Sequence, residues 1–78
     1  MYYRKNGENK LSAEAYLEAA AAYRTSGNSE SAAESLYSAA ESFTAAKLKG
    51  DARETANTLK ELYPQSHYAQ SVDRLTGN

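Results

Sequence analysis

The stretch Tyr16-Leu17-Glu18-Ala19-Ala20-Ala21-Ala22-Tyr23 decides the fold of this chain, because its pattern returns twenty residues later. The large and small residues of Tyr16-x-x-Ala19-Ala20-x-x-Tyr23 match those of Leu36-x-x-Ala39-Ala40-x-x-Phe43. Residues spaced at i, i+3, i+4 and i+7 lie on one face of an α-helix. The repeat therefore predicts two amphipathic helices that pack through faces in which alanine separates larger side chains.

Start and stop signals place the first two helices around this repeat. Ser12 is a suitable N-cap for the first helix, and Gly27 is the expected left-handed residue after its end. Asn28 or Ser29 can cap the second helix, which we expect to be the longest and to end at the stop glycine Gly50. The predicted buried face of this second helix consists of Ala32, Leu36, Ala39, Ala40 and Phe43.

Two further helices are predicted in the second half of the chain. Asp51, followed three residues later by Glu54, forms a capping-box-like start for a third helix, which ends at Tyr63-Pro64. Ser66 can cap a short fourth helix. The predicted buried residues are Ala52, Ala56, Leu59 and Leu62 in the third helix and Tyr68, Val72 and Leu75 in the fourth. The expected fold is all-α, an antiparallel array of three amphipathic helices plus a short fourth.

The 78 residues suffice for one domain, which we place at residues 12–76, behind an N-terminal arm of residues 1–11. The arm mixes aromatic, basic and turn-forming residues without a helical period, and Asn6-Gly7 is a strong turn signal. The core is expected to be thin, because seven Leu, one Val, one Phe and seven Tyr leave alanine to fill most small interior positions. The tyrosines of the arm are expected to fold back over part of this core.

Composition argues against several classes of function. Nine basic and ten acidic residues give a net charge of −1, which favours neither nucleic acid nor an anionic membrane as the partner. The absence of cysteine excludes disulfides, thiolate metal sites and cysteine nucleophiles. No apolar run reaches the roughly 20 residues that a membrane-spanning helix needs. The only histidine, His67, has no carboxylate at a ligand spacing, so neither a metal site nor a cofactor is predicted.

The two stripes continue into a longer pattern. After the first stripe, Ala32, Leu36 and Ala39 follow at the distance of a second helix, and an overlapping register runs from Leu36 to Pro64. This pattern, which covers about Ala13 to Pro64, resembles the tetratricopeptide repeat. The order of its alanine and aromatic residues is similar to that in the helices of soluble NSF attachment proteins. The microtubule-interacting-and-trafficking domain is an alternative of similar length, although Pro64 interrupts the long third helix that it needs.

A second resemblance lies in the linker before the last helix. The stretch Tyr63-Pro64-Gln65-Ser66-His67-Tyr68-Ala69 is similar to a linker that is common in bacterial envelope proteins with tetratricopeptide repeats. What the family resemblance implies is a scaffold that binds a peptide or helix of another protein, without chemistry of its own. The family's inner-face positions fall on Glu14, Leu17, Ala21, Arg24 and Thr25 in the first register, and on Glu34, Tyr37, Glu41, Thr44 and Ala45 in the second.

Five of these positions form the predicted contact surface for a partner, because they lie off the core stripes of adjacent helices: Leu17, Ala21, Arg24, Tyr37 and Glu41. Exposed apolar anchors such as Leu17 and Tyr37 are what a helix-in-groove contact uses. The alternative is that the buried stripe is simply wide, so that both side chains belong to the core. Arg24 has an alternative role as well, because a cation in the last turn stabilises the helix dipole.

Two further groups of residues give weaker indications of function. The acidic row of Glu30, Glu34 and Glu41 can face a basic partner, or it can be solvated helix surface. Aromatic and basic residues occur together in Tyr2-Tyr3-Arg4-Lys5, a composition that can stack on single-stranded nucleic acid. A flexible arm with so few cations is weak support, and nucleic acid is not predicted as the partner.

The sequence therefore predicts a non-catalytic protein–protein interaction module that binds a peptide or helix of a partner protein. The alternative is a small self-assembling helical unit, natural or engineered, whose partner is a second copy of itself. No enzyme is predicted, because no serine lies in a nucleophile-elbow context and no pair of groups has a catalytic spacing. The chain is expected to be soluble, without membrane insertion, and cytoplasmic by default, or part of a bacterial envelope protein if it is a fragment.

Overall fold

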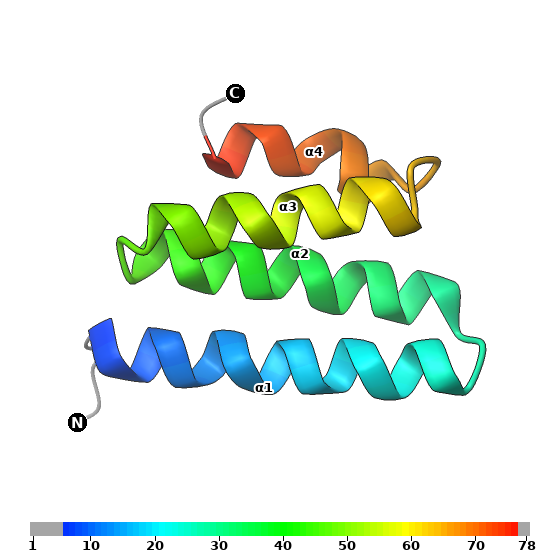
Figure 1. Ribbon diagram of the computed structural model, residues 1–78, viewed down its shortest axis with the longest axis horizontal. Coiled ribbons are helices and arrows are strands. Elements are labelled where there is room, and N and C mark those ends of the chain that lie inside the picture. The colour runs from blue at the N-terminus through cyan, green and yellow to red at the C-terminus, as the bar shows by residue number, and fades with distance from the viewer. Residues whose placement is uncertain (1–5, 77–78) are drawn as a thin grey trace.

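The computed structural model describes residues 6–76 and the side chains of residues 9–75, and this part of the chain forms four helices and no strand. The helices are α1 (Asn6–Thr25), α2 (Ser29–Ala45), α3 (Lys49–Leu62) and α4 (His67–Thr76). Successive helices run antiparallel to one another (Figure 1). The predicted all-α fold is thus confirmed.

The second helix, α2, is the element around which the others are placed (Figure 1). It packs against α1, α3 and α4, and α3 also packs against α4. Within residues 6–76, the backbone of α1 approaches no helix other than α2. The second helix therefore packs on both of its sequence neighbours, whereas α1 has a single neighbouring helix within the described residues.

The turn between α1 and α2 has the predicted geometry. Gly27 has a φ of 82°, in the left-handed region that glycine adopts without strain. The amide of Gly27 donates to the Arg24 carbonyl at 3.1 Å, and the amide of Asn28 donates to the Tyr23 carbonyl at 2.8 Å. These two hydrogen bonds define a Schellman motif. The Asn28 side chain then caps α2 by accepting the amide of Ser31 at 3.2 Å.

The turn between α2 and α3 repeats this geometry twenty residues later, at a different position from the one predicted. The left-handed residue is Lys47, with a φ of 65°, whereas the expected stop glycine Gly50 lies inside α3. The amide of Lys47 donates to the Thr44 carbonyl at 3.0 Å, and the amide of Leu48 donates to the Phe43 carbonyl at 2.9 Å. Leu48 packs against the cluster that contains Phe43. We attribute the early reversal at Lys47 to the packing of the half-buried Leu48 against this cluster, a contact that often accompanies a Schellman turn.

Because this turn comes early, α3 also begins earlier than predicted. It starts at Lys49, and its N-cap, Leu48, makes no side-chain hydrogen bond to the helix. The capping box predicted from Asp51 and Glu54 is therefore wrong. Asp51 still lies in the first turn of α3, where a negative charge is favourable to the helix dipole.

The start of α1 also differs from the prediction. The helix begins at Asn6 instead of Ser12, so residues 6–11 of the predicted arm are helical and the turn predicted at Asn6-Gly7 is wrong. Glycine costs less in a first helical turn than in a helix interior, because the amides there have no intrahelical partner to lose. At 20 residues, α1 is longer than α2 with 17, contrary to the expectation. The first five residues, with the predicted cover of the core by their tyrosines, lie outside the described residues.

The connection between α3 and α4 has the predicted form. Tyr63 follows the last residue of α3 and donates its amide to the Leu59 carbonyl at 2.9 Å, and Pro64 prevents a further helical turn. The hydroxyl oxygen of Ser66 accepts the amide of Tyr68 at 3.1 Å, which satisfies one free donor at the start of α4. The predicted helix end and the predicted cap are both confirmed.

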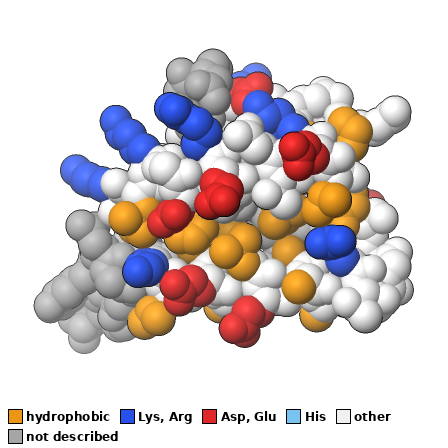
Figure 2. Space-filling model, viewed as in Figure 1, with side chains coloured by type: hydrophobic (Ala, Val, Ile, Leu, Met, Phe, Trp, Pro, Cys, Tyr) orange, Lys and Arg blue, Asp and Glu red, His pale blue; other side chains and the backbone are white. Residues whose placement is uncertain are grey.

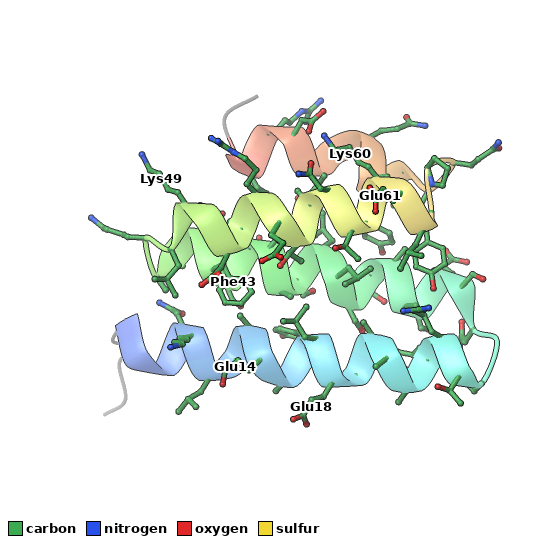
Figure 3. All side chains as sticks on the ribbon, viewed as in Figure 1. Glu14, Glu18, Phe43, Lys49, Lys60 and Glu61 are labelled. Atoms are coloured by element: carbon green, nitrogen blue, oxygen red, sulfur yellow. The ribbon has the colours of Figure 1, made fainter. Side chains whose placement is uncertain are left out.

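Alanine fills most of the core, as expected. The largest fully buried side chains are Leu59 of α3 and Val72 of α4. A smaller cluster joins Phe43 of α2 to one alanine of α1 and one of α3 (Figure 3). Leu62, which was predicted to be buried, is 39% exposed because it lies at the end of α3, beyond the packed part of the helix. The main cluster consists of Ala20, Ala33, Leu36, Ala40, Ala56, Leu59, Ala69 and Val72, with Tyr68 and Leu75 packed against it as predicted.

The repeated pattern is buried in α2 and largely exposed in α1. In α2, Leu36 and Phe43 are 4% and 5% exposed, whereas the equivalent Tyr16 and Tyr23 of α1 are 42% and 39% exposed. The prediction that both tyrosines belong to the core is therefore wrong. The physical reason is that α2 has neighbours on several sides, whereas α1 has one and can bury only one narrow face. That face consists of Ala13, Leu17 and Ala20.

Replacing Lys47 by glycine is expected to stabilise the protein. A left-handed φ costs a non-glycine residue about 1–2 kcal/mol, and glycine avoids this cost. Part of the resulting gain in stability is offset, because glycine has greater conformational freedom in the unfolded chain. We expect the free energy of unfolding to rise by about 0.5–1 kcal/mol, measured by urea unfolding with circular dichroism. The control is Arg53→Gly on the exposed surface of α3, which is expected to destabilise by about 1 kcal/mol. A loss of stability in Lys47→Gly would contradict the left-handed turn.

Equivalent residues of the repeat are expected to differ in their contribution to stability. Leu36→Ala removes a buried side chain and should lower the free energy of unfolding by about 2–4 kcal/mol. Tyr16→Ala removes a half-exposed side chain and should lower it by less than about 1 kcal/mol in dilute solution. Thermal unfolding of both variants measures the difference. Similar losses in the two would mean that α1 is packed as tightly as α2.

Candidate partner-binding surfaces

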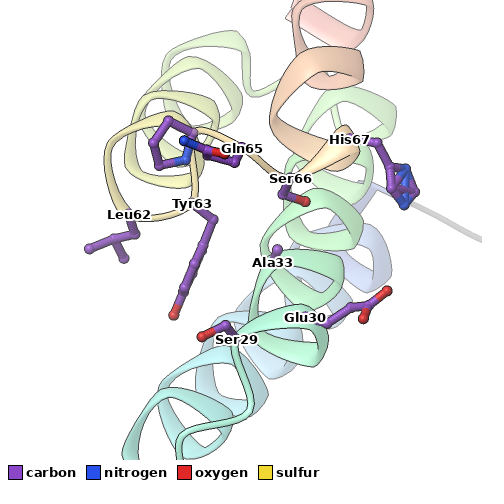
Figure 4. Close-up of a pocket in the computed structure, with 9 residues that line it drawn as sticks. Ser29, Glu30, Ala33, Leu62, Tyr63, Gln65, Ser66 and His67 are labelled. Carbon is purple, nitrogen blue, oxygen red and sulfur yellow. The ribbon is translucent and has the colours of Figure 1, made fainter.

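An open cleft of about 530 Å³ lies at one end of the helical array (Figure 4). Its apolar walls come from Ala33 of α2, Leu62 at the end of α3, and Tyr63 and Pro64 of the following linker. Figure 4 shows the Tyr63 ring extending from the end of α3 toward Ser29 at the start of α2. The cleft thus combines an aromatic and aliphatic surface with the first turn of a helix.

Local sequence signals place each wall of this cleft. Pro64 ends α3, and the Ser66 cap starts α4 three residues after Tyr63, so the linker is held as a short bridge across the end of the array. On the other side, the Asn28 cap fixes the first turn of α2 and with it Glu30. The polar side chains that line the cleft are Ser29, Glu30, Gln65, Ser66 and His67.

Negative charge gathers beside the cleft on the exposed face of α2. The pKa of Tyr68 is raised above its ordinary value of 10.0, first because burial disfavours the charged phenolate, and then because of the charges of Glu34 and Glu30 and a side-chain hydrogen bond with Glu34. The Tyr68 ring packs against two other rings, with centroid separations of 5.5 Å to Tyr37 and 4.1 Å to His67. Two members of the acidic row predicted from the sequence therefore lie near an aromatic group.

The described residues contain no arrangement typical of a metal centre. Among the side chains of residues 9–75, no group of three or more His, Cys, Asp or Glu residues is placed to hold a metal ion. His67 is exposed and lies beside the Tyr68 ring. What the cleft offers chemically is a surface for an apolar side chain, with a carboxylate nearby that can attract a cation.

The structure divides the five predicted partner-binding residues into two groups. Leu17 and Tyr37 are half-buried and pack against the main core cluster. Ala21, Arg24 and Glu41 are exposed. For Leu17 and Tyr37 the alternative of a wide buried stripe therefore fits the structure, and their assignment as off-core residues is wrong.

The structure does not bring these five residues onto one surface. Ala21 and Arg24 lie one turn apart on α1. Tyr37 turns toward α4, where it meets Tyr68, and α4 does not contact α1. Glu41 lines a shallow groove of about 340 Å³ between α1 and α2. Their common role in partner binding remains a prediction.

A basic cleft of about 620 Å³, which the sequence analysis missed, lies at the opposite end of α2. Figure 2 shows Lys and Arg side chains gathered over the start of α3 and beside α4. Four exposed cations line the cleft: Lys47, Lys49, Arg53 and Arg74. Within the described part of the chain none of them pairs with a carboxylate, whereas the Nζ of Lys60 lies 2.6 Å from the Oδ1 of Asp73. Lys47 and Lys49 lie close together in the sequence, but only the fold brings Arg74 of α4 beside them.

Comparisons with known proteins do not place the chain in a family. No protein-family model matches it, and searches of curated proteins and of solved structures found no match. The resemblance to the tetratricopeptide repeat therefore rests on the sequence pattern alone. A separate finding concerns the membrane: no helix within residues 6–76 is both long enough and apolar enough to cross a bilayer.

The substitution Glu34→Gln, which removes a negative charge, is expected to lower the pKa of Tyr68 toward 10.0. Ultraviolet titration of tyrosinate formation measures this pKa, with Tyr68→Phe used to identify the signal among the seven tyrosines. Because the folded pKa exceeds the unfolded value, this phenol contributes stability below pH 10 that is lost as the pH rises through the folded pKa. Glu41→Gln, on the same helix but not among the causes of the shift, should leave the titration unchanged. If Glu34→Gln and Glu41→Gln changed the pKa of Tyr68 equally, the shift could not be attributed to the neighbouring Glu34.

Proposed function

We propose that this protein is a non-catalytic interaction module that binds a peptide or helix of a partner protein at the cleft between α2 and the α3–α4 linker. The observation that supports this proposal is the composition of the cleft, in which Leu62, Tyr63 and Pro64 form an apolar wall beside the carboxylate of Glu30. Leu62 is 39% exposed, so its side chain is accessible at the edge of the cleft.

The size and polarity of the cleft favour one side chain as the anchor. Concave sites of about 300–1,000 Å³ with mainly apolar walls are the usual setting for a buried anchor group. Hot spots of protein interfaces are most often aromatic or large apolar residues held in such pockets. We therefore propose that the partner segment inserts a Phe or Leu side chain between Tyr63 and Ala33.

The charges beside the cleft indicate which residues should stand next to this anchor in the partner segment. Glu30 lines the cleft and Glu34 lies one turn further along α2, and both are exposed. Opposite charge at the rim of an interface raises the association rate and sets the orientation of the partner. A Lys or Arg within one helical turn of the apolar anchor is therefore expected in the partner. The cleft replaces the contact surface that was predicted from the sequence, because the five residues of that surface do not lie together.

The proposal can be tested with short N-acetylated, C-amidated peptides that carry one central Phe between two Lys residues in an alanine background. Titration into the ¹⁵N-labelled protein should shift the amide signals of Ala33, Gln65 and Ser66 more than the others. Replacing both Lys residues of the peptide by Glu should weaken binding by about tenfold, because the peptide then meets Glu30 as a like charge.

Matched variants of the protein separate the cleft from general charge effects. Glu30→Lys should abolish the shifts, whereas Glu41→Lys makes the same charge change on the same helix outside this cleft and should leave them. Leu62→Ala should weaken binding, and Leu11→Ala is the control, because Leu11 is also exposed but lies on α1. Equal binding of Lys and Glu peptides, or shifts that map to another surface, would exclude this cleft as the site.

A further inference from the structure

The first helix, α1, carries a second apolar face that no other helix covers. Its core face packs on α2, and within residues 6–76 no other helix approaches it. On the remaining surface, Tyr16 is 42% exposed and Tyr23 39% exposed, with the half-buried Ala19 between them. We call the set Ser12, Tyr16, Ala19 and Tyr23 the tyrosine stripe. Its members follow one another at spacings of four, three and four residues, which keep them on one side of a helix.

The internal repeat shows what such a stripe does when a helix covers it. The residues of α2 that stand twenty positions later are Ala32, Leu36, Ala39 and Phe43, and all four are buried. Leu36 shares a core cluster with Leu59 of α3, and Phe43 shares one with Ala52 of α3. In α2 this pattern is therefore a helix-packing surface. In α1 the same pattern is covered by no helix of residues 6–76, although Ser12 and Tyr16 border α2 across a groove.

The half of α1 that contains the tyrosine stripe carries no charge between Asn9 and Ser26. On a helical wheel, the four charged residues of this segment lie on the opposite half: Lys10, Glu14, Glu18 and Arg24. Figure 3 shows Glu18 pointing away from α2, on the outer side of α1. Ala15 and Ala22, both exposed, extend the uncharged surface beside the stripe. Depletion of charge with enrichment of tyrosine is the compositional mark of an interface core.

The spacing of the stripe makes it complementary to itself. A two-fold axis midway between Leu17 and Glu18 places residue 12 opposite residue 23 of a second copy, and residue 16 opposite residue 19. Each tyrosine then meets a small residue, Tyr16 meeting Ala19 and Tyr23 meeting Ser12. Alternation of large and small residues across facing positions allows two helices to pack closely. A two-fold contact of this kind is closed, because it uses the same patch on both copies.

The surface of the protein is hollowed where this arrangement needs space. The shallow groove of about 340 Å³ between α1 and α2 is lined by Ser12 and Tyr16 on one side and by Glu41, Ser42 and Ala45 on the other. Ser12 is the residue that the two-fold arrangement places opposite the partner's Tyr23. The ring of that tyrosine can therefore enter the groove, where its hydroxyl group finds Ser42 and Glu41 as hydrogen-bond partners.

We propose that this protein forms a homodimer through antiparallel pairing of the tyrosine stripes of two copies of α1. The contact is one helix pair about 30 Å long, which is small beside the roughly 1,600 Å² of a standard interface. The dimer is therefore reversible and dissociates on dilution. The cleft at the α3–α4 linker shares no lining residue with the tyrosine stripe, so dimerisation and the peptide binding proposed above use separate surfaces.

Sedimentation velocity over a wide concentration range tests the proposal. The unsubstituted chain should pass from monomer to dimer as its concentration rises. Tyr16→Glu with Tyr23→Glu should raise the dissociation constant by about tenfold or more, because it puts four charges into the paired stripes. The control is Leu11→Glu, which adds a charge at a residue that is 66% exposed but lies outside the stripe. A monomer at every concentration, or a dimer that the double variant leaves unchanged, would overturn the proposal.

Cross-linking tests the register separately, and the absence of natural cysteine makes it simple. Ser12→Cys protein mixed with Tyr23→Cys protein should form a disulfide-linked pair on mild oxidation, because the two positions face each other. Ser12→Cys protein alone should not, because its two copies lie at opposite ends of the paired helices. Thermal unfolding of the reduced variants shows that each is folded. Equal cross-linking of Ser12→Cys alone would exclude the antiparallel register.

Discussion

Close approach of helices through alanine is the constraint on which the rest of this structure depends. Three helices pack around α2, and alanines such as Ala33, Ala39 and Ala40 leave room for backbones to come near one another. The apolar area buried by each alanine is small, and burial contributes only about 25 cal/mol per Å². The fold therefore gains stability from many modest contacts, and larger side chains such as Leu59 and Val72 are confined to the centre.

The same constraint explains which parts of the fold could be predicted from the sequence. Signals that act locally, such as the left-handed Gly27, the Asn28 cap and the Pro64 stop, were assigned correctly, because each satisfies backbone groups of its own turn. The position of Lys47 could not be found in this way. Its turn is explained by the packing of Leu48 against the cluster around Phe43, and that contact depends on how three helices come together.

The repeated stripe shows a second limit of sequence reasoning. Tyr16 and Leu36 occupy equivalent positions, yet one is half-exposed and the other is buried. A helical period in the sequence predicts which residues share a face, but it does not predict how many other helices will pack against that helix. The same limit affected the candidate site, since Leu17 and Tyr37 were placed outside a stripe that proved to be wide. The end cleft was missed for a related reason, because Leu62, Tyr63 and Ala33 come from separate elements that only the fold brings together.

The single contact surface of α1 also determines how the molecule can come apart. In the part of the chain that the structure describes, helices α2, α3 and α4 each contact at least two others, whereas the backbone of α1 approaches α2 alone. Detaching α1 therefore requires the opening of one helix interface, and a local opening of this kind would define a separate cooperative unit. The α1–α2 interface, which contributes Ala13 and Ala20 to the core, is therefore the contact through which binding at the outer face of α1 can act on the other three helices.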